Sequence, residues 1–155
     1  MEINKTEIAG FTLTGLALKT KTTNANGQSA IDCGSLWQQF EKGNYADKIP
    51  GKLDNEIIAV YHSYDGDHTQ PFSYFIGCRV AAGSTAPAGV DSLTIAKGTY
   101  QKFIAKGKMP GCIANTWREI WRTGIPRAYT ADFEIYDERS KDWNDAVVEI
   151  FIAVK

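Results

Sequence analysis

The sequence predicts an α+β fold in which two similar halves share an antiparallel sheet. Each half contains a strand-like segment, a helix-like segment and then two strand-like segments that form a hairpin. A connector rich in Gly, Pro and Ala at about residues 82–89 separates predicted repeats at about 5–81 and 90–155. One repeat alone would leave a sheet face poorly covered, so we expect a single domain over residues 1–155.

Aromatic residues at equivalent places in the two halves support the repeat. The three pairs are Trp37 and Trp117, Tyr61 and Tyr136, and Phe75 and Phe151. The members of each hairpin pair are separated by almost the same number of residues, although the halves share little other identity. The pattern therefore indicates an internal duplication.

The first half is expected to hold a strand, a helix and a hairpin in that order. Residues 8–21 mix β-branched and apolar side chains, as strands do. A helix follows, with Ser29 as its N-cap and Gly43 at its end. Its apolar residues share one face: Leu36, Trp37 and Phe40. Residues 56–80 contain two apolar and aromatic runs around an Asp-Gly-Asp turn, which predicts a hairpin.

The second half repeats this order. Residues 91–107 predict a strand, and residues 131–155 predict a second hairpin. The helix between them is expected to have Pro110 near its start and Gly124 just past its end, which is the usual asymmetry of these two residue types.

Composition and charge exclude several classes of function. A chain of 155 residues with 43% hydrophobic and 23% charged residues is typical of a soluble globular protein. Its net charge of −1 and its lack of a basic run argue against direct DNA binding. The N-terminus lacks the layout of a signal peptide, and no segment reaches the roughly 18 apolar residues of a membrane span. We therefore expect a cytoplasmic protein with no membrane partner.

Neither a metal nor a cofactor is expected. The cysteines are odd in number and lack CxxC spacing, which favours reduced thiols over a disulfide framework or a zinc site. Asp65, Asp67 and His68 lie in one polar turn that lacks the spacing of a calcium-binding loop. A solvated turn is the favoured interpretation of that segment.

Glu134 raises the question of function, because it lies inside a predicted strand between apolar residues. Side chains alternate across a strand, so Glu134 and Tyr136 share one face while Phe133 and Ile135 share the other. The carboxylate either faces water from a half-exposed strand or lines a pocket that receives a positive charge. Periodicity alone leaves both interpretations open.

The last strand and the first hairpin extend the face of Glu134. The last strand contains an aliphatic set of Ile150, Ile152 and Val154. If this set packs on the helices, Glu149 and Phe151 join Glu134 on the opposite face. Tyr61 joins them from the first hairpin, and Phe75 follows if the two halves are equivalent. The pattern predicts helices on one side of the sheet and a ligand cleft on the other.

A sheet face that carries aromatic rings and a carboxylate favours an organic cation. Exposed aromatic surface usually marks a binding site. Rings attract cations by roughly 0.5–2 kcal/mol per contact, and a carboxylate in apolar surroundings is costly unless it is paired. We therefore expect an amphipathic cation with flat apolar bulk. Burial is expected to raise the pKa of Glu134, so that it stays neutral until a cation arrives.

Structural interpretations compete for the remaining candidates. Glu149 is either a ligand contact or a solvated residue at the rim, and Trp37 is either core or pocket wall. Trp117 and Trp121 are spaced four residues apart, which favours core packing of their helix. Trp143 lies in a predicted turn, where it either caps the pocket or rests on the surface.

The segments "TWREIW", "RAYTADFEIYD" and "VEIFIAVK" make the sequence similar to the GyrI-like effector-binding domains. Such domains occur fused to AraC- and MerR-type regulators and as stand-alone proteins. The branch that it resembles is the integron-associated effector-binding proteins, through "TNANG", "LWQQF", "IIAVYHSY", "IGCRV" and "TADFEIYD" in that order. The resemblance covers essentially the whole chain, and "DFEIYD" with the closing "EIFIAVK" is its most specific part.

This resemblance implies a tandem βαββ fold with pseudo-twofold symmetry and a ligand cleft between the halves. It also implies binding of amphipathic, often cationic drugs or dyes, with the glutamate of an E-x-Y motif meeting the charge. In this sequence the motif is Glu134-Ile135-Tyr136. The aromatic wall is placed less strictly in such domains, and the candidates are Tyr61, Phe75, Trp37 and Phe151.

Because the strand pattern starts near residue 8, we expect no helix-turn-helix domain in this sequence. We expect a stand-alone effector-binding protein, monomeric or weakly dimeric, that sequesters its ligand or signals to a separate transcription regulator. Two alternatives stay open. One is a hydrolase of reactive electrophiles with Glu134 as general base and Tyr136 or Tyr61 as donor. The other is an inhibitor of a partner protein such as a topoisomerase.

Overall fold

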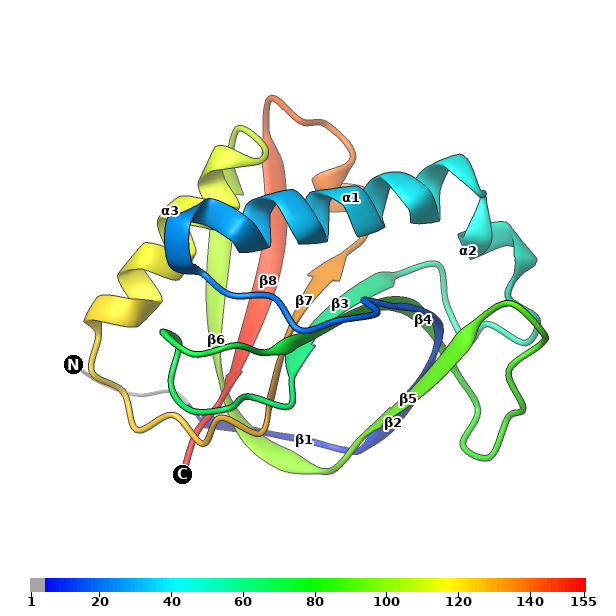
Figure 1. Cartoon of the computed structure of the whole chain (residues 1–155), viewed down its shortest axis with the longest axis horizontal. Coiled ribbons are helices and arrows are strands. Elements are labelled where there is room, and N and C mark those ends of the chain that lie inside the picture. The colour runs from blue at the N-terminus through cyan, green and yellow to red at the C-terminus, as the bar shows by residue number, and fades with distance from the viewer. Residues whose placement is uncertain (1–4) are drawn as a thin grey trace.

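The computed structural model describes residues 5–155 and shows an eight-stranded antiparallel sheet with helices on one face (Figure 1). The strands are β1 (Lys5–Ile8), β2 (Phe11–Ala17), β3 (Ile57–His62), β4 (Ser73–Val80), β5 (Asp91–Ile95), β6 (Gly98–Gly107), β7 (Ala131–Tyr136) and β8 (Ala146–Ala153). The helices are α1 (Gln28–Lys42), α2 (Tyr45–Lys48) and α3 (Gly111–Arg122), with 3₁₀ turns η1 (Ala25–Gly27) and η2 (Glu138–Ser140). Residues 1–4 of the predicted domain lie outside the described part.

The strand order β1-β6-β8-β7-β3-β4-β2-β5 is symmetric about its centre. Strands β2, β3 and β4 with α1 form one βαββ unit, and β6, β7 and β8 with α3 form the other. The predicted α+β fold of tandem units with pseudo-twofold symmetry is therefore confirmed. The units meet where β3 pairs with β7, with Ala59 opposite Glu134. Each unit also takes its outermost strand from the other half, because β1 pairs with β6 and β5 pairs with β2.

This exchange divides each predicted leading strand into two. Residues 8–21 span the end of β1 and all of β2, and residues 91–107 contain both β5 and β6. Between β1 and β2 the chain turns a corner against β5, where a Cβ atom on Gly10 would stand 2.9 Å from the carbonyl oxygen of Ile95. A larger side chain at this close approach would collide with the neighbouring backbone.

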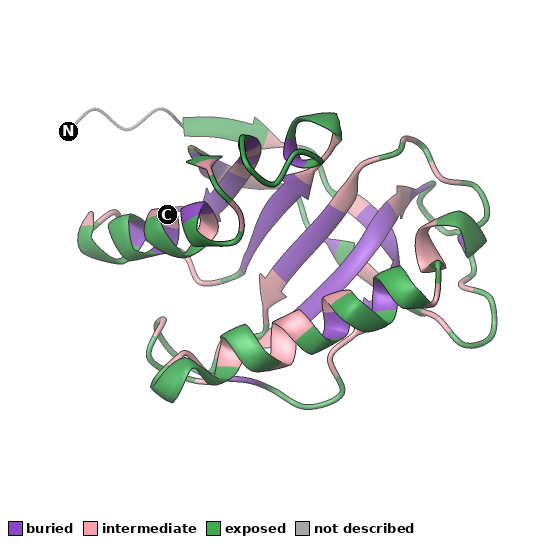
Figure 2. Ribbon diagram, turned by 90° about the horizontal axis from the view of Figure 1, so that it is seen from above, coloured by how far each residue is buried: buried purple, intermediate pink, exposed green. Residues whose placement is uncertain are grey.

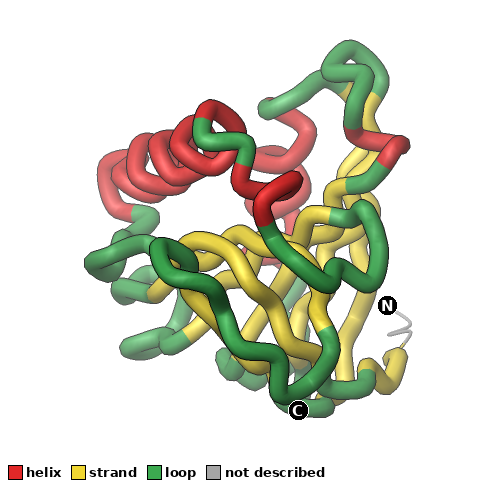
Figure 3. Tube along the Cα trace, turned by 90° about the vertical axis from the view of Figure 1, so that its right-hand side faces the viewer, coloured by secondary structure: helices red, strands yellow, loops and turns green. Residues whose placement is uncertain are grey.

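The sheet curls until its two ends approach each other (Figure 3). Only Ala9 and Gly10 separate β1 from β2, although these strands lie near opposite ends of the strand order. The inner face of the curl is filled by an apolar core centred on Phe133. Its ring centroid lies 5.1 Å from that of Phe11 on β2 and 5.2 Å from that of Tyr100 on β6. The core thus joins strands that are distant in the sheet.

Both long helices pack on the outer face of the sheet, each over its own unit, with buried strands beneath them (Figure 2). Leu36 and Phe40 bury one side of α1, and Trp117 and Ile120 bury one side of α3. The packing of the two helices therefore leaves a strip of the outer face between them.

Within residues 5–155, no helix combines the length and apolar character needed to cross a membrane.

The helix ends agree only partly with the sequence prediction. Helix α1 begins after Gly27, which adopts a left-handed φ of 70°. Ser29 is therefore not the N-cap; its hydroxyl instead donates a hydrogen bond to Asn24 Oδ1 at 2.9 Å. The predicted end at Gly43 is confirmed, because this residue is the C-cap of α1. Gly124, with a φ of 68°, follows the C-cap of α3 as predicted.

The sequence analysis places the cleft on the wrong face of the sheet. Residues directly opposite each other in an antiparallel pair share a face. Glu134 pairs with Ile150, and Ile150 packs under α3 as predicted for the aliphatic set. The carboxylate and the helices are therefore on the same face. Phe75 and Phe151 point the other way and lie in the inner core with Phe133. Parity within one strand could not reveal this, because it does not fix the register between strands.

Replacing Phe75 with Ala is expected to destabilise the fold by about 3–5 kcal/mol, because the ring is 1% exposed in the inner core. Urea unfolding followed by circular dichroism measures the loss. Ile104→Ala is the matched control, since Ile104 is 56% exposed on a strand and its loss should change the free energy of unfolding by about 0.5 kcal/mol or less. Similar costs at the two positions would contradict the assignment of Phe75 to the core.

Candidate functional site

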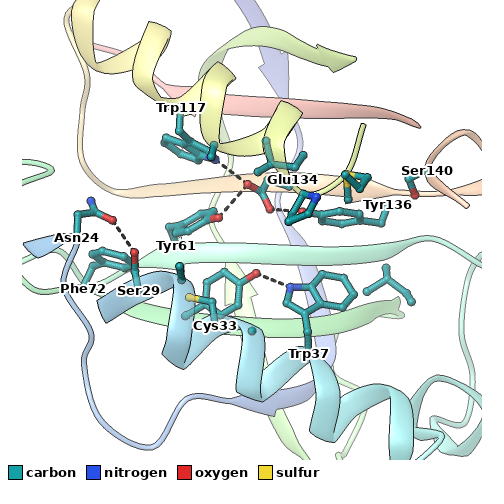
Figure 4. A pocket seen from close by; sticks show the side chains of 18 of the residues that line it. Asn24, Ser29, Cys33, Trp37, Tyr61, Phe72, Trp117, Glu134, Tyr136 and Ser140 are labelled. Carbon is teal, nitrogen blue, oxygen red and sulfur yellow. Dashed lines mark hydrogen bonds between the residues drawn. The ribbon is translucent and has the colours of Figure 1, made fainter. Parts of the chain in front are cut away.

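A cavity of about 1120 Å³ lies between α1 and α3 on the outer face of the sheet. Side chains of α1 form one wall and side chains of α3 form the other, while β3, β4 and β7 supply the floor (Figure 4). Because α1 belongs to the first unit and α3 to the second, the cavity lies between the halves, as the resemblance implies. Its volume is slightly above the roughly 300–1,000 Å³ that is typical of small-molecule pockets.

Glu134 lies on the floor of this cavity and is only 1% exposed. Its Oε2 accepts hydrogen bonds from the Tyr61 hydroxyl at 2.8 Å and from Trp117 Nε1 at 2.7 Å. Its Oε1 accepts one from the Tyr136 hydroxyl at 2.7 Å (Figure 4). The donors come from β3, α3 and β7, so both units hold the carboxyl group. All three donors are neutral.

Burial raises the pKa of Glu134 above its ordinary value, while the hydrogen bonds from Trp117, Tyr136 and Tyr61 oppose that rise. Burial and the neighbouring Glu134 also raise the pKa of both tyrosines well above the ordinary value, so their hydroxyls stay protonated and can donate. The charged form of Glu134 is therefore hydrogen-bonded but carries a desolvation cost. A cation in the cavity would offset that cost.

Aromatic rings form a continuous wall around the carboxyl group. The ring of Trp37 lies 4.8 Å from that of Tyr136, and Trp37 Nε1 donates a hydrogen bond to the Tyr74 hydroxyl at 2.8 Å. The ring of Tyr61 lies 4.9 Å from the rings of both Tyr74 and Trp117. These contacts fix the ring orientations, so the wall is preorganised for a flat apolar ligand.

Further aromatic side chains stand at the two ends of the cavity. At one end, His68 stacks on Trp121 with ring centroids 5.2 Å apart, and Asn24 Nδ2 donates a hydrogen bond to the His68 carbonyl at 2.8 Å. The expectation that Trp121 packs in the core is wrong, because it lines the cavity and is exposed. At the other end, Trp143 lines the cavity and is also exposed.

The structure brings four of the predicted ligand-binding residues together at the cavity: Glu134, Tyr136, Tyr61 and Trp37. Their contact with a ligand stays a prediction. Phe75 and Phe151 lie in the inner core and do not line the cavity. Glu149 also lies away from it and pairs with Lys102 Nζ and Arg139 Nη2, both at 3.2 Å.

Several cavity residues are not predicted as ligand contacts from the sequence, among them Trp117, Tyr74 and Arg127. Trp117 is predicted in the core, and it does pack there, but its indole nitrogen also reaches Glu134. Tyr74 is not among the sequence candidates, whereas the adjacent Phe75 is. The register of the hairpin was the missing signal, because it places Tyr74 directly opposite Tyr61.

Cys33 also lines the cavity, but it is not a nucleophile at neutral pH. Burial, with the nearby Glu134, raises the pKa of its thiol to about 12. Residues 5–155 contain no group of three or more side chains placed to hold a metal ion. In the polar turn, Asp67 accepts a hydrogen bond from the backbone N–H of Thr69.

Comparison with known proteins gives one family and several relatives. A family model described as integron-associated effector binding protein matches residues 6–154 of the chain. YobU of Bacillus subtilis (strain 168), whose name assigns it provisionally to the transcriptional regulators, is 26% identical over 125 residues. The match covers 78% of this chain and 78% of YobU.

Solved structures show the same fold over the whole chain. An integron cassette protein of Vibrio cholerae, VCH_CASS2, is 32% identical with a TM-score of 0.75, and the match covers 99% of this chain and 95% of that one. SAV2435, which was solved bound to tetraphenylphosphonium, is 20% identical with a TM-score of 0.79. That match covers 100% of this chain and 94% of SAV2435. At this identity the likeness to SAV2435 shows the fold alone.

The raised pKa of Glu134 predicts a pH-dependent contribution to stability. A carboxyl group whose pKa is raised by folding holds its proton more tightly in the folded state, so its contribution falls as pH rises from 4.5 through the folded value. Glu134→Gln removes this loss. The free energy of unfolding of the variant, minus that of the wild type, should therefore increase over this range by up to about 1.4 kcal/mol per pH unit. Urea unfolding of both proteins between pH 4 and 8, in steps of about one unit, measures the difference; a flat or decreasing difference would contradict the shift.

Proposed function

Because the chain belongs to the integron-associated effector-binding protein family, we propose that it binds amphipathic organic cations between α1 and α3, with Glu134 meeting the positive charge. One observation carries this proposal. Glu134 is 1% exposed inside an aromatic cavity, and its three hydrogen-bond donors are all neutral. A buried carboxylate with this environment lacks a counter-charge that a cationic ligand supplies.

The energetics favour a ligand that combines charge with flat apolar surface. Aromatic faces contribute roughly 0.5–2 kcal/mol for each cation–π contact. The apolar body of the ligand gains about 25 cal/mol for each Å² that it removes from water. The ion pair with Glu134 adds selectivity for charge, although desolvation of both partners offsets part of its energy. The hydrogen bonds from Tyr61 and Tyr136 hold the carboxylate in place before the ligand arrives.

A structural neighbour supports the class of ligand. SAV2435 was solved bound to tetraphenylphosphonium, which is a lipophilic aromatic cation. The name of YobU supports a link to regulation of transcription. We propose that the present chain either sequesters its ligand or signals the presence of the ligand to a separate regulator.

The two competing hypotheses have less support. A hydrolase would use Glu134 as a general base, but the known family is defined by effector binding. The thiol of Cys33, with its pKa near 12, is no substitute nucleophile. An inhibitor of a partner protein would need an exposed recognition surface, whereas the aromatic and acidic groups described here converge on a cavity.

If Glu134 recognises the charge, Glu134→Gln should weaken the binding of cations more than the binding of uncharged ligands. Gln has nearly the same shape, and its amide oxygen can still accept from Tyr61 and Trp117, while its amide nitrogen can donate to the Tyr136 hydroxyl oxygen. We expect the affinity for tetraphenylphosphonium to fall by about tenfold or more, because hydrogen-bonded charge contacts contribute about 1.5–3 kcal/mol. Isothermal titration calorimetry measures both proteins.

Triphenylmethanol is the uncharged counterpart of similar shape for this experiment. Its affinity should change by about twofold or less between the wild type and Glu134→Gln, because it makes no ion pair. Equal losses for the cation and the alcohol would show that the substitution disturbs the cavity as a whole. That result would remove the charge-recognition part of the proposal.

Binding of the cation should also depend on pH. The ligand favours the carboxylate, so affinity should fall as pH decreases through the raised pKa of Glu134 in the empty cavity. Trp117→Phe removes a donor that stabilises the carboxylate, so the loss of affinity should begin at a higher pH in this variant. Titrations of tetraphenylphosphonium across the pH range test both statements, and Glu134→Gln, which has no carboxyl group to titrate, should show a flat profile.

A further inference from the structure

A second buried charged group, Arg127, lines the same cavity. Its side chain is 5% exposed, and its Nη2 donates to Asp132 Oδ2 at 2.8 Å. The guanidinium carbon lies 4.3 Å from the ring centroid of Tyr129 and 5.8 Å from that of Trp117. Arg127 is therefore held against aromatic rings, close to the indole that also donates to Glu134.

The hydrogen bonds of Arg127 and Asp132 are unequally satisfied. Besides Arg127, Asp132 accepts from the Tyr64 hydroxyl and from the backbone N–H of Ala153, so both of its carboxylate oxygens are used. Arg127 Nε and Nη1 are buried, and neither has a hydrogen-bond partner within residues 5–155. A guanidinium presents a planar set of donors, and here the donors on either side of the occupied Nη2 are unused.

The two buried N–H donors of Arg127 would be stabilised by a hydrogen-bond acceptor from outside the chain. Leaving a buried polar group without a hydrogen bond costs about 1–3 kcal/mol, and more for a charged group. Arg127 is part of the cavity wall, and because these two nitrogens have almost no accessible surface, the guanidinium must turn for a partner in the cavity to reach them. Since Trp117 contacts Arg127 and hydrogen-bonds to Glu134, a ligand that lies on this indole comes close to both groups.

The charge of the Arg127–Asp132 pair restricts what the partner can be. The two groups already neutralise each other at 2.8 Å in a buried place. An additional anion would leave a net negative charge there, with a desolvation cost. An uncharged oxygen acceptor, such as an ester or ketone carbonyl, satisfies one of the free N–H groups without that cost.

We propose that Arg127 forms a second polar subsite of the cavity, which recognises an uncharged oxygen acceptor carried by the cationic ligand. The preferred ligands are then aromatic cations with a carbonyl group attached to the ring system. This inference rests on the proposed function, because Glu134 supplies the contact with the positive charge. It adds a determinant of specificity that plain lipophilic cations do not use.

Three dyes with one shared cationic core test the subsite. Tetramethylrosamine has a phenyl substituent, tetramethylrhodamine methyl ester adds an ester carbonyl to that ring, and tetramethylrhodamine has a free carboxylate in its place. Fluorescence titration should show that the wild type binds the ester about tenfold more tightly than the rosamine, as expected for a hydrogen bond to a charged donor. The carboxylate dye should bind no more tightly than the ester.

Arg127→Lys is the variant that separates the donor fork from the charge. Lys keeps a positive charge beside Asp132 but lacks the planar set of N–H groups. We expect the ester to lose about tenfold in affinity while the rosamine changes by about twofold or less. Near-ultraviolet circular dichroism checks that the variant folds. If it does not fold, the Nε–H resonance of Arg127 in the wild type decides: it should shift with the ester and not with the rosamine.

The outcomes distinguish this subsite from the proposed function. Equal binding of ester and rosamine by the wild type would overturn the subsite while leaving the role of Glu134 intact. Equal losses for both dyes in Arg127→Lys would reduce Arg127 to a structural residue. Tighter binding of the carboxylate dye would overturn the preference for an uncharged acceptor. Rosamine binding that is absent, or unaffected by Glu134→Gln, would refute the proposed function itself.

Discussion

The junction of the two halves depends on one buried carboxyl group, that of Glu134. Glu134 belongs to β7 of the second unit, and one of its donors, Tyr61, comes from β3 of the first. The pairing of β3 with β7 is therefore held by side chains as well as by the backbone. Trp117 brings α3 to the same point. Any change that separates the units also removes a hydrogen bond from this group, so the geometry of the site depends on the docking of the two units.

The curl of the sheet explains why an open cavity is tolerated at that junction. A flat sheet would have to bury one face entirely under helices to gain enough apolar contact. Here the sheet buries its inner face against itself, with Phe133 stacked on Phe151 at 4.9 Å. The buried members of this core all come from strands. The helices can then stand apart on the outer face, where α1 and α3 each cover their own unit and leave a cavity between them.

The sequence predicts the repeat, the helices, the hairpins and the position of Glu134 beside Tyr136 on one strand face, because these follow from local periodicity and from short motifs. It failed where the answer depended on register between strands. Parity within β7 correctly placed Glu134 with Tyr136, but only the pairing with β8 shows that Phe151 faces the other way. The choice of Phe75 over Tyr74 failed for the same reason. Arg127 left no such signal, because it lies in an irregular segment whose position is fixed only by tertiary contacts.

Two acidic residues on one strand show how burial alone does not define a binding site. Asp132 and Glu134 are two residues apart on β7, point to the same face and are both almost completely buried. Asp132 has a guanidinium partner at 2.8 Å, so its charge is neutralised within the protein. Glu134 has phenols and an indole, which orient a carboxylate without neutralising it. The charge of Asp132 is thus compensated by Arg127, whereas the charge of Glu134 is met only by neutral hydrogen-bond donors. Glu134 lines the cavity, so we expect a cation that enters it to gain most at this carboxylate.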